Sequence, residues 1–152
     1  MKLAEALILR ADAQKQIEQL RQRLMRSARV QEGEQPPEDP QVLITELETT
    51  SNQLVRLVQR INRTNSVTRF QAGILSDALA ERDSLRLKRN AYDSLINAAA
   101  IRQDRYMRSE LRLVSTFNVA ELQRQIDQLS RQYRELDAQI QALNWATDLI
   151  EA

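Results

Sequence analysis

Eight residues near the C-terminus follow one another at alternating steps of three and four positions, and this heptad spacing constrains the fold more than any other feature. Such spacing lays one narrow apolar stripe along a helix that packs against other helices. Gln, Arg, Glu and Asp fill most of the positions between. The sequence therefore predicts a helix-packing protein that associates with copies of itself. The eight residues are Val119, Leu122, Ile126, Leu129, Tyr133, Leu136, Ile140 and Leu143.

Three further stretches carry stripes of the same period, so we expect a mainly all-α fold. The four long helices should form a bundle, or antiparallel coiled-coil hairpins, in a single helical-bundle domain over 1–152. Their expected bounds are about 3–29, 40–64, 76–102 and 118–149. The stripes of the first three are Leu3, Ala6, Arg10, Ala13, Ile17, Leu20 and Leu24; Leu43, Leu47, Thr50, Leu54, Leu57 and Ile61; and Ala78, Arg82, Leu85, Arg89, Tyr92, Ile96 and Ala99.

The starts of the last three helices have good capping residues. Asp39 precedes Pro40, which suits the first helical position. Ser76 caps the third helix, and Asn118 caps the fourth, with Glu121 three residues on as a capping box. Between the first two helices, glycine and proline break the pattern and predict an exposed, acidic, Pro-rich loop at 31–40.

Two other stretches favour extended structure, so a small β element is expected around 66–75 and 109–116. The first contains β-branched residues and Gly73, which is typical of a turn or hairpin, and the second alternates like a half-buried strand. The segment 103–117 either runs back along the bundle as a strand or forms a compact loop that gives an up-down bundle. The sequence leaves both alternatives open.

Composition excludes several kinds of chemistry. The chain has no cysteine and no histidine, so thiol chemistry, disulfides and the commonest general base and metal ligand are absent. Its 22 basic and 21 acidic residues nearly cancel, and a protein that binds nucleic acid through phosphates usually carries a clear basic excess. The apolar N-terminal stretch, 3–9, is too short to span a membrane. We therefore expect a cytoplasmic protein without a cofactor, a metal, a membrane span or a nucleic-acid partner.

A candidate polar cluster comes from the helix ends that an antiparallel arrangement brings together. Two of its arginines fall on predicted stripes, where an unpaired charge is costly, so each should find a carboxylate; Glu5 and Glu81 are the natural partners. The cluster is then either an ion-pair network that fixes helix register, a pocket for a cation or polar ligand, or plain solvent-facing surface. Its members are Glu5, Arg10, Asn62, Asn65, Glu81 and Arg82.

A second candidate is a basic run with Tyr106 that could contact phosphates or another anionic surface. The alternative is a solvated surface balanced by Asp104 and Glu110. The candidate anion contacts are Arg102, Arg105, Arg108 and Arg112. Near the end of the last helix, Trp145 is interpreted as a helix-end packing residue, with a ligand contact as the alternative.

Several blocks of the chain, taken together, resemble the septicolysin-like bacterial family of small helical proteins. They are LAEALILRADAQKQIEQLRQRL, RINRTN, LSDALAERDSL, VSTFNVAELQRQIDQL and NWATDL, and they cover nearly the whole chain. The family name implies a thiol-activated, pore-forming toxin. This chain has no cysteine to activate and no long amphipathic hairpin for a membrane, and the resemblance supplies no catalytic residues.

The leading hypothesis is a non-enzymatic structural or interaction protein that assembles into a homo-oligomer through its heptad faces. One alternative is a ligand- or ion-binding protein, or an unusual enzyme, that uses the polar cluster. A second alternative is a membrane-active protein of the septicolysin type. No residue is predicted to be catalytic, to bind a cofactor or to hold a metal.

Overall fold

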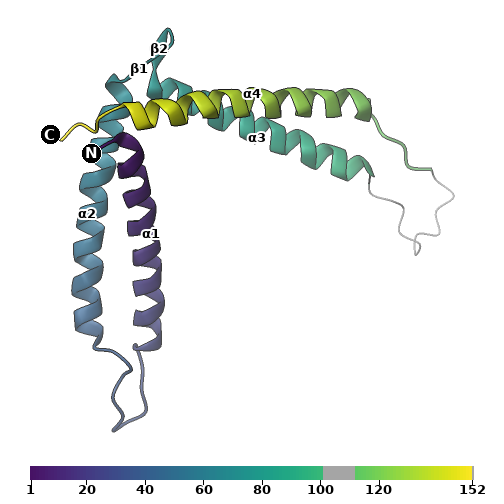
Figure 1. Ribbon diagram of the computed structural model, residues 1–152. Coiled ribbons are helices and arrows are strands. Elements are labelled where there is room, and N and C mark those ends of the chain that lie inside the picture. Colours follow the sequence, from purple (N-terminus) through teal and green to yellow (C-terminus); the bar gives the residue numbers. More distant parts are fainter. Residues whose placement is uncertain (101–111, 152) are drawn as a thin grey trace. The chain divides into compact units, whose positions relative to one another are not determined.

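The computed structural model describes residues 1–100 and 112–151. In this part of the chain, four helices and a two-stranded antiparallel sheet make up the regular structure (Figure 1). The expectation of a mainly all-α fold with a small β element is therefore confirmed. The chain divides into a first unit, Met1–Leu75 with Gln141–Ala152, and a second unit, Ser76–Ile140. That residues 1–152 form one domain stays a prediction.

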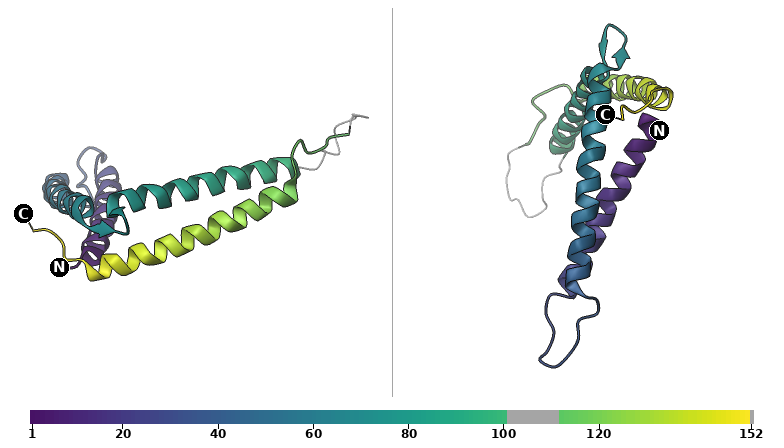
Figure 2. Two further views of the ribbon diagram at one scale, coloured as in Figure 1. Left: turned by 90° about the horizontal axis from the view of Figure 1, so that it is seen from above. Right: turned by 90° about the vertical axis from the view of Figure 1, so that its left-hand side faces the viewer.

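The first unit is built on two antiparallel helices that lie side by side, α1 (Leu3–Arg26) and α2 (Pro40–Val67), here called the first helical pair (Figures 1 and 2). At the start of α1 the Glu5 carboxylate accepts a hydrogen bond from the Lys2 backbone N–H at 2.6 Å. At the start of α2 the Asp39 carboxylate accepts one from the Gln41 backbone N–H at 2.9 Å. Both contacts satisfy backbone donors that a helix leaves free at its N-terminus.

The core of the first helical pair consists of the two stripes predicted from the sequence. Every residue of both stripes is buried or half-buried. Leu3 and Leu20 are fully buried on α1, and Leu43 and Ile61 are 2% and 1% exposed on α2. Burying each such side chain contributes roughly 1.5–3 kcal/mol, so this seam is the main stabilising element of the unit.

A tight hairpin follows α2. Strands β1 (Arg69–Phe70) and β2 (Gly73–Ile74) pair antiparallel, with Arg69 opposite Ile74 and Phe70 opposite Gly73. The turn is possible because Gln71 adopts a left-handed backbone conformation with φ of 51°. The β element expected around 66–75 is thus present. In the second expected stretch, the described residues 112–116 contain no strand, and the rest of it lies outside the described residues.

The second unit contains most of helices α3 (Leu75–Ala100) and α4 (Val119–Ala146), which form the second helical pair. Arg82 contacts Asp137, and further along α3 Arg89 lies over the ring of Tyr133. The contact that lies later in α3 involves the earlier residue of α4, so the two helices are antiparallel, as Figures 1 and 2 also show. Most of the segment 103–117 lies outside the described residues, so whether it runs back as a strand or forms a compact loop stays a prediction.

The seam of the second helical pair is thinner than that of the first. Ala78, Ile126, Leu129 and Ile140 are its buried apolar residues, at 4%, 6%, 8% and 0% exposure. The rest of the predicted α3 stripe is half-buried, and of the predicted α4 stripe only Val119 is exposed, at 38%. The two predicted stripes thus face inward. None of the described helices is both long and apolar enough to cross a bilayer.

Candidate functional site

One hollow of the first unit is a groove between α1 and α2, here called the base groove. It has a volume of about 390 Å³. A second, more open hollow of about 510 Å³ shares two of its residues, Met1 and Leu9, and adds Glu5 and Ile8. The base groove is lined by Met1, Leu9, Asp12, Ala13 and Gln16 from the α1 side and by Gln53, Arg56, Leu57 and Arg60 from α2.

The floor of the base groove is apolar because it borders the helical seam. Ala13 and Leu57 belong to the two interhelical stripes and are half-buried. Leu9 lies beside the stripe and remains 45% exposed, and Met1 and Ile8 are 49% and 52% exposed. Three large apolar side chains within little more than two helical turns make a continuous exposed patch, which is a more informative feature than isolated surface residues.

The rim of the base groove carries two arginines with different surroundings. Arg60 donates from Nε to the Ile150 carbonyl oxygen at 3.3 Å and forms an ion pair with Glu151. Arg56 lies four residues earlier, on the same face of α2, and lines the groove. Within residues 1–100 and 112–151, Arg56 makes no hydrogen bond or ion pair. The groove therefore offers one guanidinium without a partner beside apolar surface, and its lining also includes the Asp12 carboxylate.

Residues 147–151, here called the C-terminal strap, hold the N-terminal end of α1 in place. The Leu3 N–H donates to the Thr147 carbonyl at 2.9 Å, and the Leu149 N–H donates to the Met1 carbonyl at 2.9 Å. The Ile150 N–H donates to the buried Thr64 hydroxyl at 3.0 Å. These backbone contacts fix Met1 on one side of the groove.

An ion pair adds to the strap. Lys2 Nζ lies 2.7 Å from the Asp148 carboxylate. Its hydrogen bond and its positive charge lower the pKa of Asp148 from the ordinary value of 3.8. The two side chains are 41% and 79% exposed, so solvent screens the pair, which contributes little to stability and mainly orients the strap.

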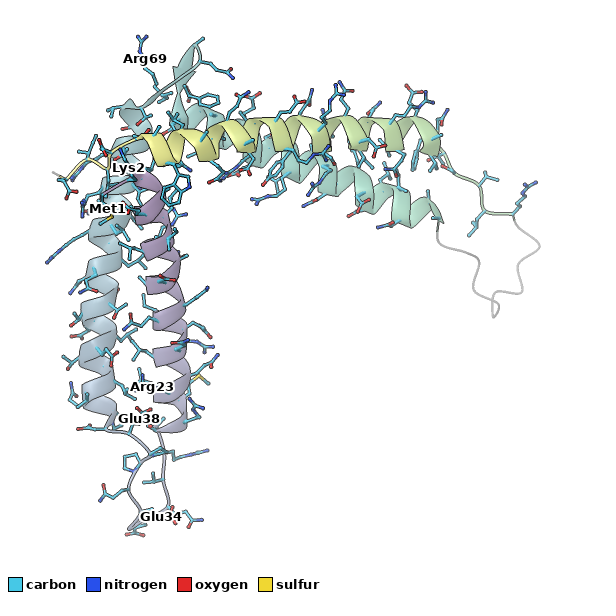
Figure 3. The ribbon with its side chains drawn as sticks, viewed as in Figure 1. Met1, Lys2, Arg23, Glu34, Glu38 and Arg69 are labelled. Atoms are coloured by element: carbon cyan, nitrogen blue, oxygen red, sulfur yellow. The ribbon has the colours of Figure 1, made fainter. Side chains whose placement is uncertain are left out.

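The opposite end of the first helical pair holds the acidic loop, residues 31–40. Arg23 donates from Nε to the Glu38 carboxylate at 2.9 Å, and this hydrogen bond lowers the pKa of Glu38 from the ordinary value of 4.5. Figure 3 shows Arg23 beside Glu38 at the loop end, with Met1 and Lys2 at the other end of the pair. Glu34 lies further out in the loop and lines an open hollow there with Arg26.

The second unit contains a short polar network in its seam. Arg82 Nη1 donates to Asp137 at 3.1 Å and Arg82 Nε to Asp83 at 3.3 Å. The Arg89 guanidinium lies 5.7 Å from the centre of the Tyr133 ring. Polar groups at seam positions fix the register of paired helices, because a slip of one helix would leave them unpaired. Arg82 thus has carboxylate partners, and they are Asp83 and Asp137.

The residues of the predicted polar cluster belong to both units: Glu5, Arg10, Asn62 and Asn65 to the first, Glu81 and Arg82 to the second. No hydrogen bond or ion pair of the described residues joins any two of the six. Glu5 caps α1 instead of pairing with an arginine. The cluster as a ligand pocket stays a prediction.

The basic run is described at one position only. Arg112 is exposed, and Arg102, Arg105 and Arg108 lie outside the described residues. Trp145, interpreted from the sequence as a packing residue, is 54% exposed. Among the described residues, no group of three or more acidic side chains is placed to hold a metal ion.

The base groove was missed in the sequence because its residues come from two helices and lie beside the stripes. One signal was present: Leu9 and Ile8 add apolar positions outside the α1 heptad. A second exposed surface was also missed. Helix α3 carries a further heptad line without charged residues, which is exposed at every position: Ala80, Ser84, Leu87, Ala91, Ser94 and Ala98.

The fold and the groove define a helical protein that contains two antiparallel helical pairs. The chain matches the model of a family of unknown function, DUF6847, over residues 10–149, and it belongs to that family. It is also similar to a solved structure described as a functionally unknown conserved protein from Corynebacterium diphtheriae. The two are 46% identical with a TM-score of 0.89, and the similarity covers 99% of each chain. No curated protein matches the chain.

The resemblance to the septicolysin-like family is therefore wrong. Neither the family match nor the solved relative indicates such a family. The longer blocks on which the resemblance depended are rich in Ala, Leu, Gln, Arg and Glu at helical spacing. Many unrelated amphipathic helices share this composition, because any helix with one buried face needs it. The blocks therefore indicated helices and not a family.

Proposed function

We propose that this protein is a non-enzymatic helical interaction protein that assembles with further copies of itself. The observation that carries the proposal is the base groove, where Met1 and Leu9 stay about half exposed beside the guanidinium of Arg56. A groove with an apolar floor and a charged rim is the common form of a protein-binding surface. Its position on two packed helices gives it a rigid frame, which favours binding of a preformed partner.

Nearly all residues of the four predicted heptad stripes are buried or half-buried within the two helical pairs. Self-assembly therefore has to use the remaining surfaces, of which the base groove is the more structured. The apolar line on the outer face of α3, with Leu87 at 67% exposure, offers a further area of contact. These faces support an interaction protein better than an enzyme, because the polar residues on them do not converge on one point.

The proposal is tested by measuring mass in solution. Size-exclusion chromatography with light scattering is run at loading concentrations from about 1 to 100 µM, the range in which weak assemblies form. We expect a mass above that of the monomer that rises with concentration. A monomer mass at every concentration would overturn the proposal.

A further inference from the structure

We propose that the occupant of the base groove is the acidic loop of a second copy of this chain, and that two copies exchange their loops reciprocally. This inference rests on the proposed self-assembly and names the surfaces that carry it. The inference is argued from complementarity between the base groove and the acidic loop. The base groove is apolar and contains a cation without a partner, and the acidic loop carries an exposed apolar residue.

The groove can accept a carboxylate next to an apolar side chain. Arg56 has no partner in the described part of the chain, and Leu9 and Leu57 lie beside it. The neighbouring Arg60 already shows the mode of binding, because it takes the Ile150 carbonyl and the Glu151 carboxylate of the C-terminal strap. One arginine of this rim thus binds a backbone carbonyl and the carboxylate of the next residue. Arg56 offers the same chemistry one turn earlier.

The acidic loop presents the matching groups. Glu32 and Glu34 are exposed, and neither side chain makes a hydrogen bond or an ion pair among the described residues. Val30, at 41% exposure, precedes them and supplies an apolar side chain. Gly33 lies between the two acids with φ of 88°, a conformation that turns the chain sharply and suits glycine. The loop therefore presents its acids and its valine outward at a turn.

The placement of the two parts selects a second copy as the partner. Met1 lies at one end of the first helical pair and Glu34 in the loop at the other end (Figure 3). Arg56 is 16 residues from the start of α2 at Pro40, so it lies ~24 Å from the loop end of the pair, and a loop anchored at both helix ends does not reach it in its own chain. Two copies placed antiparallel bring each loop to the groove of the other. The result is a closed two-fold contact in which both copies use the same two surfaces.

The charges that have no partner in the first helical pair suit this antiparallel arrangement. At the groove end Arg56 has no partner in the described residues, and Asp12 is a further lining residue. At the loop end Glu32 and Glu34 have no partner in the described residues, and Arg26 and Arg29 line the same open hollow as Glu34. Antiparallel placement sets Arg56 of one copy against Glu32 and Glu34 of the other. Complementary charges of this kind select partner and orientation more than they add affinity.

A charge-swap series tests the inference by sedimentation velocity of the full chain. Arg56→Glu should weaken self-association by roughly tenfold or more, as expected when an attraction becomes a repulsion at an interface. The double substitution Glu32→Arg with Glu34→Arg should weaken it similarly. Combining all three substitutions should restore the dissociation constant to within about threefold of the unsubstituted protein, since a swapped pair is attractive again. Restoration is a result that damage to folding cannot produce.

The control is Lys15→Glu, the same change of charge at an exposed position of α1 that does not line the groove. It should leave self-association unchanged. If the unsubstituted protein assembles and Arg56→Glu assembles equally well, the loop-in-groove contact is wrong while self-assembly stands. A strictly monomeric unsubstituted protein overturns both. If Arg56→Glu disrupts assembly and the triple variant fails to restore it while retaining its helical circular dichroism, the groove binds another part of the partner and the acidic loop is excluded.

Discussion

Arg82 on α3 and Asp137 on α4 are joined by an ion pair in the seam of the second helical pair, with Nη1 3.1 Å from Oδ1. Their side chains are 20% and 33% exposed, so the pair is partly shielded from water. The pair itself contributes little net stability. Removing one partner costs more free energy than the pair contributes, because the remaining charge stays desolvated.

We therefore expect Asp137→Ala to lower the free energy of unfolding by about 1–3 kcal/mol. Arg82→Leu should cost less, since the charge that it leaves behind, Asp137, is 33% exposed and has more access to water than Arg82 at 20%, and since leucine keeps apolar volume at a seam position. The measurement is urea denaturation followed by circular dichroism at 222 nm. Arg131→Leu is the matched control, because Arg131 is exposed and its contact with Glu135 is 3.7 Å long. Equal losses for Arg82→Leu and Asp137→Ala would contradict this account.

Acid should weaken the loop end of the first helical pair through Glu38. The Arg23 hydrogen bond lowers the pKa of Glu38 in the folded protein below its ordinary 4.5, so the unfolded chain takes up the proton first. The stabilisation is fully present above the unfolded value and is lost as pH falls through the folded one. Glu38→Gln should therefore lower Tm slightly at pH 7, and the difference from the unsubstituted protein should begin to shrink near pH 4.5 and disappear once the pH has fallen through the lower pKa of folded Glu38.

The measurement is Tm against pH from about 7 to 2, the range over which a carboxylate with a lowered pKa titrates. Glu48→Gln serves as control, because Glu48 is exposed and makes no hydrogen bond in the described residues. Its Tm difference should not change with pH. A Glu38→Gln difference that persists unchanged at low pH would show that the ion pair with Arg23 does not form in solution.

The helices and their buried faces could be predicted because both depend on local spacing. The stripe from Leu3 to Leu24 follows from a period that any amphipathic helix obeys, and capping residues such as Asp39 mark where a helix starts. Helix α1 ends at Arg26, earlier than the expected 29, and spacing alone does not mark this end; there the Ser27 N–H is shared between the Arg23 and Leu24 carbonyls, each at 3.1 Å.

Pairing across the fold could not be predicted in the same way. The sequence required a carboxylate for Arg82 and suggested the near neighbour Glu81, whereas the antiparallel packing of α4 supplies Asp137, 55 positions away. The base groove has the same origin, because Leu9 and Arg56 meet only once α1 and α2 have paired. Contacts of this kind depend on register between elements, which a single sequence does not encode locally.

Two leucines represent the two faces of the second helical pair, Leu129 the packed face and Leu87 the outer face. Leu129 is 8% exposed and Leu87 is 67% exposed. Leu129→Ala should lower the free energy of unfolding by about 2–4 kcal/mol, because it leaves a cavity in a thin core. Leu87→Ala should change it by less than about 0.5 kcal/mol. Urea denaturation at two protein concentrations checks both, and a large, concentration-dependent loss for Leu87→Ala would show that the outer face of α3 is covered in an assembly.

The C-terminal strap should depend on the hydroxyl of Thr64. This side chain is 1% exposed, accepts a hydrogen bond from the Ile150 N–H at 3.0 Å and donates one to the Arg60 carbonyl at 2.8 Å. Thr64→Val keeps the shape and removes the acceptor, so the partly buried Ile150 N–H loses its partner. We expect a loss of about 1–3 kcal/mol in the free energy of unfolding, and faster amide hydrogen exchange at Ile150. Thr45→Val, which removes an exposed hydroxyl bonded to the Gln41 carbonyl, should alter neither. Unchanged exchange at Ile150 in Thr64→Val would mean that backbone pairing with Met1 and Leu3 alone holds the strap.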